Sequence, residues 1–299
     1  MAKQRYENRK QVKNARWLIF FVVLAQLAAD VAVQAIVSFM PEPPHQYIQI
    51  ALCEILAVGV PIFVYGRSVR RSPSGALKKE LMLKPCAVWL VVTAALLGIT
   101  GQFIMMLLNM PANIYIREVL KTDSADAIPV ALSGWELLLG SAAVAIIPAV
   151  LEEFWMRGLV FSAYNRCSTS AAIVFTSVVF ALIHMRADEF AGFLFMGFTA
   201  AYIMLRTRSL YAAIAYHAAS NLAALCFGYV LAGILPYIWY IFGAAAVLFI
   251  VFAVLLLRGT ERIRRNRTMK AGKIFWKSVF SLPFLLSAAL AVLRHFIAL

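Results

Sequence analysis

Charged side chains are scarce in this chain. Only 14% of its 299 residues are Asp, Glu, Lys or Arg, whereas 63% are hydrophobic, and the mean hydropathy is +0.82. Soluble domains carry about 25% charged residues. The composition therefore excludes a water-soluble fold and predicts a polytopic helical membrane protein.

Cysteine and the common hydrolase motifs are also scarce or missing. The four cysteines are far apart, show no CxxC spacing and lie within or beside apolar segments: Cys53, Cys86, Cys167 and Cys226. We interpret them as packing residues, not as disulfides or metal ligands. No GxSxG and no HExxH occurs, so the sequence lacks the serine-hydrolase elbow and the common zinc-protease helix.

Acidic residues are outnumbered by 28 Lys and Arg to 14 Asp and Glu, which gives a net charge of +14. The basic residues occur in short runs between apolar segments. In such places they set the orientation of a membrane protein and contact anionic headgroups. We therefore expect membrane lipids as partners and no nucleic acid.

Long apolar windows are abundant. Windows of about 20 apolar residues, enough to cross ~30 Å of hydrocarbon, lie near 17–40, 47–66, 87–110, 134–157, 170–186, 190–206, 209–231, 234–257 and 276–297. They predict an all-α polytopic transmembrane bundle of about eight to nine spans, forming a single membrane domain over residues 1–299. The first window is longer than the ~7–15 residues of a cleavable signal core, so we interpret it as an uncleaved span.

The distribution of Lys and Arg predicts the orientation. If the N-terminus is in the cytoplasm, four segments are cytoplasmic: the tail before Trp17, 67–85, 206–208 and 258–277. They carry 6, 6, 2 and 8 Lys or Arg, in that order. Two of the external loops, 41–46 and 228–233, carry none. This bias predicts a cytoplasmic N-terminus. A capping box, Ser133 with Glu136, predicts the start of the fourth helix.

Several polar residues lie deep inside these windows. If the fourth helix continues past Gly158 to about Arg166, Glu152 lies ~21 Å from its cytoplasmic end. The same geometry brings three residues of later spans to a similar depth: His184, His217 and Asn221. The longer helix, which we expect to be kinked at Pro148, also predicts that Arg157 is buried.

Helical spacing assigns these side chains to faces. Glu153 and Arg157 are four residues apart and share a face, so we expect an ion pair, whereas Glu152 points about 100° away and stays free. His217 and Asn221 have the same spacing and would direct donors toward one spot, and Phe180 lies one turn before His184. Asp30 and Glu54, in the first two spans, also have a structural interpretation as interhelical hydrogen-bond partners.

This set of groups suits hydrolysis. A carboxylate and an imidazole can activate a water, and a second imidazole with a carboxamide can stabilise the resulting oxyanion. No metal is required by this interpretation. However, Glu152, His184 and His217 are chemically adequate zinc ligands, so a metal-bound water stays an alternative.

Three motifs in order then resemble a known family. The segment 152–157 matches EExxxR, 180–184 matches FxxxH and 217–221 matches HxxxN, as in the CAAX protease and bacteriocin-processing (CPBP, also Abi or type II CAAX prenyl endopeptidase) family. The resemblance covers about residues 134–227. It implies an intramembrane glutamic endopeptidase with Glu152 and His184 activating water, His217 and Asn221 stabilising the oxyanion, and Glu153 and Arg157 holding the first motif.

The sequence predicts a peptidase of a lipidated or hydrophobic peptide, in a membrane that we expect to be a bacterial plasma membrane. It does not choose between a prenylated tail, a bacteriocin and a signalling peptide. Two other classes stay open: a non-catalytic immunity or scaffold protein that binds a peptide in the same pocket, and a transporter. No inverted repeat or pair of broken helices favours the transporter.

Overall fold

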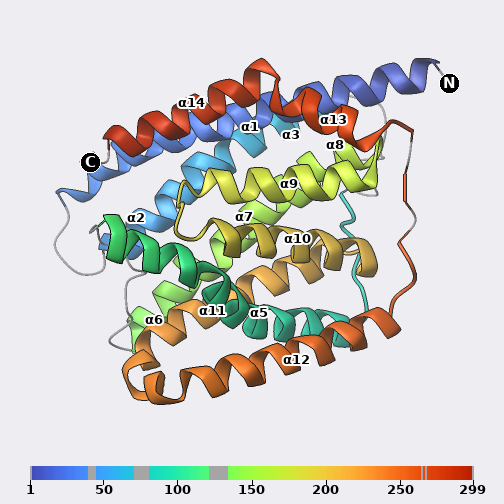
Figure 1. Ribbon diagram of the computed structural model, residues 1–299. Helices are drawn as coiled ribbons and strands as arrows, with labels where there is room; N and C mark the ends of the chain where they lie inside the picture. Colours follow the sequence, from blue (N-terminus) through green and yellow to red (C-terminus); the bar gives the residue numbers. More distant parts are fainter. Residues whose placement is uncertain are drawn as a thin grey trace.

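The protein is described here by a computed structural model that covers residues 2–39, 45–70, 81–120, 134–263, 265–266 and 268–297. All regular structure in these residues is helical (Figure 1). The helices are α1 (Ala2–Val37), α2 (His45–Glu54), α3 (Val60–Arg70), α5 (Val88–Tyr115), α6 (Gly134–Gly140), α7 (Ile147–Glu153), α8 (Phe161–Asn165), α9 (Thr169–Ile183), α10 (Phe190–Thr207), α11 (Leu210–Ile234), α12 (Ile238–Arg258), α13 (Ala271–Val279) and α14 (Leu282–Ile297).

π-Helical turns join several of these elements into longer rods. They are Ile55–Gly59, Ile116–Leu120, Ser141–Ile146 and Phe154–Val160, and a 3-10 turn, Leu235–Tyr237, precedes α12. Within the described residues, seven helices are long and apolar enough to cross a membrane, and eight if the pair α13 and α14, bent by 52°, forms one span. The all-α polytopic fold class is therefore confirmed.

One predicted span is shorter than expected. The window 170–186 corresponds to α9, which has 15 residues and ends at Ile183. His184 caps this helix, and Met185 has a left-handed φ of 54°, a conformation that side chains with a Cβ rarely adopt. The chain therefore reverses direction directly after the histidine.

The fourth helix is the long form that the polar residues predicted. From Gly134 to Asn165 it runs as one apolar rod of 32 residues. The start predicted at Ser133 lies outside the described residues. Pro148 follows the π-helical turn Ser141–Ile146, and because proline has no N–H, it cannot donate to the carbonyl of Val144 four residues earlier.

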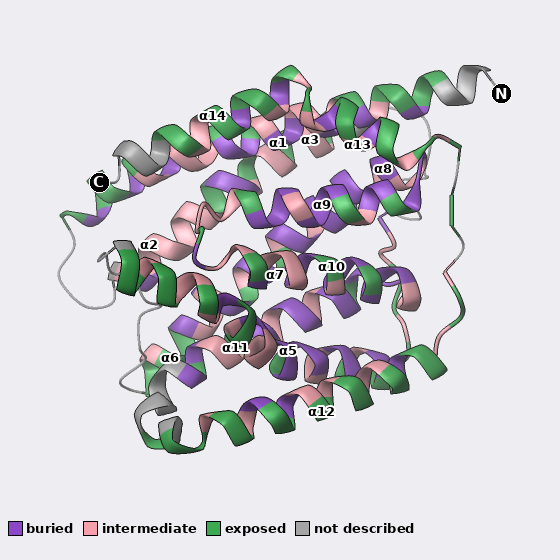
Figure 2. Ribbon diagram, viewed as in Figure 1, coloured by how far each residue is buried: buried purple, intermediate pink, exposed green. Residues whose placement is uncertain are grey.

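The helices stack in layers. α5 packs against α10, α11 and α12, and α1 packs along α14 on the opposite side of the bundle (Figure 1). Buried residues concentrate in the inner helices, whereas α12 presents many exposed ones (Figure 2). None of the four cysteines is in a disulfide bond; Cys167 is buried, Cys53 and Cys86 are half-buried, and Cys226 is exposed, so it is not the packing residue that the sequence predicted.

The α5–α11 contact depends on a glycine. A Cβ added at Gly98 would lie 2.1 Å from the backbone oxygen of Tyr216 and 3.0 Å from the backbone nitrogen of Ser220. Small residues let transmembrane helices approach this closely. Gly98 thereby fixes the position of the α11 turn that carries His217.

We expect Gly98→Ala to lower the thermal unfolding temperature of the detergent-purified protein, because α5 and α11 must separate, at a cost of about 1–3 kcal/mol. Gly243→Ala is the matched control. Gly243 lies within α12 and a Cβ there meets no atom within 4 Å, so this change should be neutral or stabilising by up to about 1 kcal/mol. Equal unfolding temperatures for the two variants would contradict the close contact.

Candidate active site

The two adjacent glutamates have different surroundings. Both are buried at the end of α7, where the π-helical turn Phe154–Val160 begins. The side chain of Glu153 is 0% exposed, whereas that of Glu152 is 11% exposed. A water-sized molecule can thus reach Glu152 but not Glu153.

Glu153 is the centre of a buried ionic cluster. Its Oε1 lies 3.0 Å from Nη1 of Arg157 and 2.9 Å from Nδ1 of His217. The Arg157 side chain is 0% exposed and its Nη2 donates to the carbonyl of Gly197 at 3.1 Å. The predicted ion pair and the predicted burial of Arg157 are both confirmed. The contact between Glu153 and His217 was not predicted.

Gly197 makes this arginine contact sterically possible. A Cβ at Gly197 would lie 3.0 Å from Cα of Ser177, so α9 and α10 cross here with little space between them. The close crossing brings the Gly197 carbonyl to the guanidinium of Arg157.

Phe180 separates the two histidines. Its ring is fully buried and lies 4.7 Å from the ring of His184 and 5.7 Å from that of His217, measured between centroids. The guanidinium carbon of Arg157 is 4.4 Å from the centre of the same ring, which is cation–π geometry. Phe180 therefore contacts both parts of the site.

The orientation of His184 is fixed from two sides. Its Nδ1 is 2.7 Å from the carbonyl oxygen of Phe180, and its ring stacks on Phe193 at 3.8 Å between centroids. Because a carbonyl only accepts, Nδ1 carries the proton and donates. In the neutral ring, Nε2 then keeps its lone pair.

Glu152 and His184 face each other across a short gap. Nε2 of His184 is 3.9 Å from Oε2 of Glu152, and this oxygen is buried without a hydrogen-bond partner among the described residues. The distance is too long for a direct hydrogen bond. A single water that donates ~2.8 Å bonds to both acceptors would span it. The His184 side chain is 21% exposed, whereas Oε2 of Glu152 is closed off from the surface, so the accessible side of the gap is the histidine.

Asn221 contacts the fourth helix at Val144, on the N-terminal side of Glu152. Its Nδ2 donates to the carbonyl of Val144 at 3.2 Å, the carbonyl to which Pro148 cannot donate. Within the described residues, no hydrogen bond joins Asn221 to Glu152 or to either histidine. The prediction that His217 and Asn221 direct donors toward one spot stays a prediction.

The predicted metal ligands do not form a complete site. No group of three or more His, Cys, Asp or Glu in the described part of the chain is placed to hold a metal ion. These donors do not fit a three-ligand zinc site in this conformation.

Three residues that touch this site or act on it were not assigned to it from the sequence. Glu54, from α2, interacts electrostatically with Glu152, Phe193 stacks on His184, and Gly197 receives Arg157. Glu54 has a buried Oε1 without a hydrogen-bond partner among the described residues. A carboxylate inside a span was a signal for Glu54, but nothing in the sequence distinguished Phe193 from other phenylalanines of its window.

Comparison with protein-family models gives a match for part of the chain. Residues 134–223, less than a third of the chain, match the family model described as Type II CAAX prenyl endopeptidase Rce1-like. No curated protein and no solved structure matches. The resemblance inferred from the three motifs is therefore confirmed. At family level the match supports a membrane peptidase of the CAAX protease type, and the apolar helices support an integral membrane protein.

We expect the ionic cluster to act as one unit in the free energy of unfolding. Glu153→Gln or Arg157→Met alone leaves a buried group without its partner and should cost about 3–5 kcal/mol. The double variant should cost clearly less than the sum of the two single changes. The measurement is thermal unfolding in detergent.

The exposed pair Arg208 and Glu261, 2.7 Å apart, is the control. Neutralising these two residues should change the stability by less than about 1 kcal/mol. Additive costs for Glu153→Gln and Arg157→Met would show that the two side chains do not depend on each other.

Proposed function

We propose, from the match of residues 134–223 to the type II CAAX prenyl endopeptidase family, that this protein is an intramembrane endopeptidase that hydrolyses a lipidated or hydrophobic peptide with a water activated by Glu152 and His184. The observation that carries the proposal is the gap between these two side chains. On one side of this gap lies a buried carboxylate oxygen without a hydrogen-bond partner among the described residues. On the other side lies an imidazole nitrogen that can accept a hydrogen bond.

The proposed reaction begins with that water. The water donates one hydrogen bond to Glu152 and one to Nε2 of His184. A lone pair on its oxygen is then free to attack the carbonyl carbon of the substrate. Glu152 takes one proton as the new C–O bond forms. The same carboxyl then returns the proton to the leaving nitrogen as the C–N bond breaks, so the products are an acid and an amine.

His217 and Asn221 are proposed to stabilise the oxyanion. While Nδ1 of His217 donates to Glu153, its Nε2 can donate only if the ring carries both protons. Asn221 uses one amide hydrogen for Val144 and keeps a second for the substrate oxygen. Donors of this kind act on charge that develops in the transition state.

We propose that hydrolysis proceeds without a resident metal. The three candidate ligands, Glu152, His184 and His217, do not form a group placed to hold a metal ion in the described part of the chain. The zinc-dependent version of the same peptidase is the alternative.

The distribution of charge supports an orientation of the protein in the membrane. The N-terminal end of α1, the C-terminal ends of α10 and α12, and α13 lie at the same end of the bundle (Figure 1). This end carries the basic segments, so we propose that it faces the cytoplasm, in the plasma membrane of a bacterium. Prenylated tails, bacteriocin precursors and signalling peptides are the candidate substrates. The non-catalytic peptide binder is the competing function.

We expect Glu152→Gln to lower the cleavage rate of an internally quenched prenylated peptide by at least ~100-fold, because a general base contributes about 10²–10⁴. Glu261→Gln, a change of the same kind at an exposed carboxylate, should leave the rate unchanged. The assay uses the protein in nanodiscs. A folded Glu152→Gln variant with full turnover would refute the base assignment. If the Glu152→Gln variant keeps the function of the protein in cells, that result would favour the non-catalytic peptide binder.

Metal removal distinguishes the two peptidase mechanisms. We expect dialysis against a chelator to leave the rate unchanged, and we expect purified active protein to contain less than stoichiometric zinc by elemental mass spectrometry. Loss of activity on chelation, with recovery on adding zinc, would replace the metal-free mechanism by the zinc-dependent one.

A further inference from the structure

One stripe of α1 changes from cationic to apolar along its length. Arg9, Val12, Arg16, Ile19 and Val23 are separated by three or four residues, so they lie on one face of the helix. All five line cavities on one side of α1, where α14 packs against it and α13 forms the opposite wall of the first cavity. The two parts of the stripe therefore belong to two neighbouring cavities.

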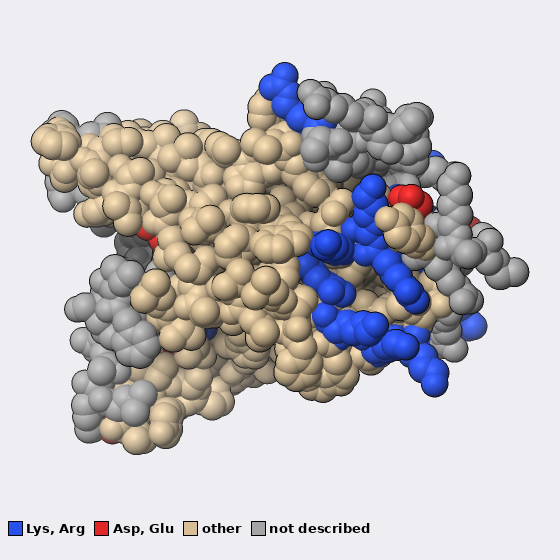
Figure 3. Space-filling model, turned by 90° about the horizontal axis from the view of Figure 1, so that it is seen from above, with Lys and Arg blue, Asp and Glu red and all other residues tan. Residues whose placement is uncertain are grey.

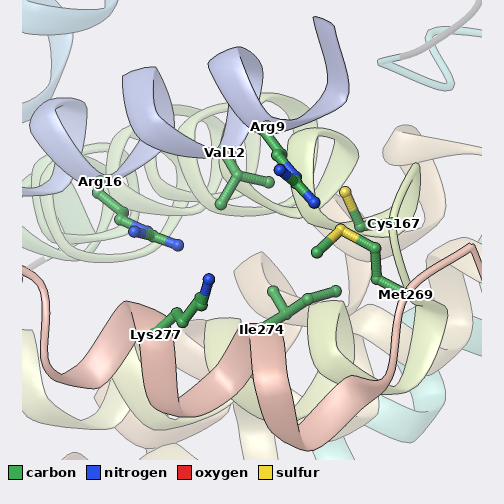
Figure 4. Close-up of a pocket in the computed structure, with 7 residues that line it drawn as sticks. All are labelled: Arg9, Val12, Arg16, Cys167, Met269, Ile274 and Lys277. Carbon is green, nitrogen blue, oxygen red and sulfur yellow. The ribbon is translucent and has the colours of Figure 1, made fainter. Parts of the chain in front are cut away.

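The first cavity is cationic. It has a volume of about 180 Å³ and lies between α1 and α13. Arg9 and Arg16 point into it from α1 and Lys277 points into it from α13 (Figure 4). Three cationic side chains line this cavity, and none of its described lining residues is acidic. An anion would offset this concentration of positive charge.

The cavity is held together by hydrogen bonds between helices. Nε of Arg16 donates to the hydroxyl of Tyr164 at 3.4 Å, and this hydroxyl donates to Oγ of Ser278 at 2.8 Å. Tyr164 and Ser278 are both fully buried. The side chain of Arg16 is thus tied to α8 and α13 and is not a freely moving surface charge.

The electrostatics at Cys167, which lines the same cavity outside the membrane-spanning helices, agree with this. Burial raises the pKa of the Cys167 thiol, and the charges of Arg9, Arg166 and Arg16 oppose this increase in pKa. Positive potential from three arginines therefore acts on the cavity wall.

The second cavity is apolar and continues along α1. It has a volume of about 170 Å³ and is lined by α1, α9 and α14. Among its described lining residues, Ser287 alone has a polar side chain, and that hydroxyl donates to the carbonyl of Pro283 at 2.8 Å. The walls of this cavity thus suit a hydrocarbon chain and offer it no free polar side chain.

The two cavities have the spacing of an amphiphile. Arg9 and Val23 are fourteen residues apart on one helix, or ~21 Å, which is about half the 40–45 Å thickness of a bilayer with its headgroups. Lys and Arg side chains gather at one end of this face of the molecule, and the other end is almost free of charge (Figure 3). Exposed Trp276 and Phe280 on and beside α13 are typical of the membrane interface.

We propose that the groove between α1 and the α13–α14 pair binds an anionic phospholipid, with its phosphate among Arg9, Arg16 and Lys277 and an acyl chain along α14. A free phosphate compound shares the headgroup chemistry but would leave the apolar cavity unused. Neither Glu152 nor His184 lines the two cavities, although Ile183 and Met185, the neighbours of His184 in the sequence, line the apolar one. The test below measures lipid retention and does not depend on peptidase activity.

The test compares two double variants with the same change in charge. Arg9→Gln/Lys277→Gln removes two cations from the cavity. Lys13→Gln/Lys273→Gln removes two exposed cations from the same helices at positions that do not line it. Protein is extracted from nanodiscs of phosphatidylcholine with phosphatidylglycerol, and native mass spectrometry counts the retained anionic lipid.

We expect the cavity variant to retain anionic lipid on the order of tenfold less well, and the control variant to retain it like the unmodified protein. Equal loss in both variants would overturn the proposal, because it would show general charge attraction. Retention unchanged in the cavity variant would also overturn it.

A second variant tests the apolar end and distinguishes the two sources of phosphate. Ala288→Trp fills the groove at an exposed alanine of α14 without changing any charge, and we expect it to release the lipid as well. Glycerol phosphate, the soluble headgroup, should not bind at millimolar concentration. Binding of glycerol phosphate that is unaffected by Ala288→Trp would replace the lipid by a free phosphate compound.

Discussion

The structure depends on keeping a charged arginine inside an apolar helical bundle. Arg157 is fully buried, and an unpaired charge in such surroundings costs several kcal/mol. Glu153, the carbonyl of Gly197 and the ring of Phe180 contact its guanidinium from three helical segments. The need to satisfy this one group aligns the fourth helix with α9 and α10. His217 on α11 then joins through the same carboxylate oxygen.

The helix that carries the glutamates departs from α-geometry on both sides of them. π-Helical turns precede and follow α7, and such turns are rare and frequently lie at functional sites. Pro148 leaves the carbonyl of Val144 without its helical donor, and the side chain of Asn221 on α11 supplies one. A backbone group released by proline thereby becomes an anchor between two helices of the site. Asn221 has a structural task in addition to any part in catalysis.

The sequence predicted those features that depend on one helix at a time. The spacing of Glu153 and Arg157 predicted their ion pair, and matched depth predicted that the fourth helix continues past Arg157. The contacts between elements were not predictable. His184 caps a short helix because the chain turns at Met185, and the link from Glu153 to His217 requires the relative rotation of two helices. Periodicity within one segment contains no information about that rotation.

Adjacent glutamates thus take different tasks through their surroundings and not through their chemistry. Glu153 is closed off by Arg157 and His217, so its charge is neutralised within the protein and no water-sized molecule reaches it. Glu152 lies one residue earlier and about 100° around the helix, and it faces His184. Nδ1 of His184 is bonded to a backbone carbonyl. This carbonyl keeps the His184 ring in the tautomer with a free Nε2 lone pair. Nδ1 of His217 instead contacts the carboxylate of Glu153, which also pairs with Arg157. The two histidines are thus held by different groups, a backbone carbonyl and a carboxylate, and the roles proposed for them differ as well, an acceptor toward water for His184 and a donor toward an oxyanion for His217.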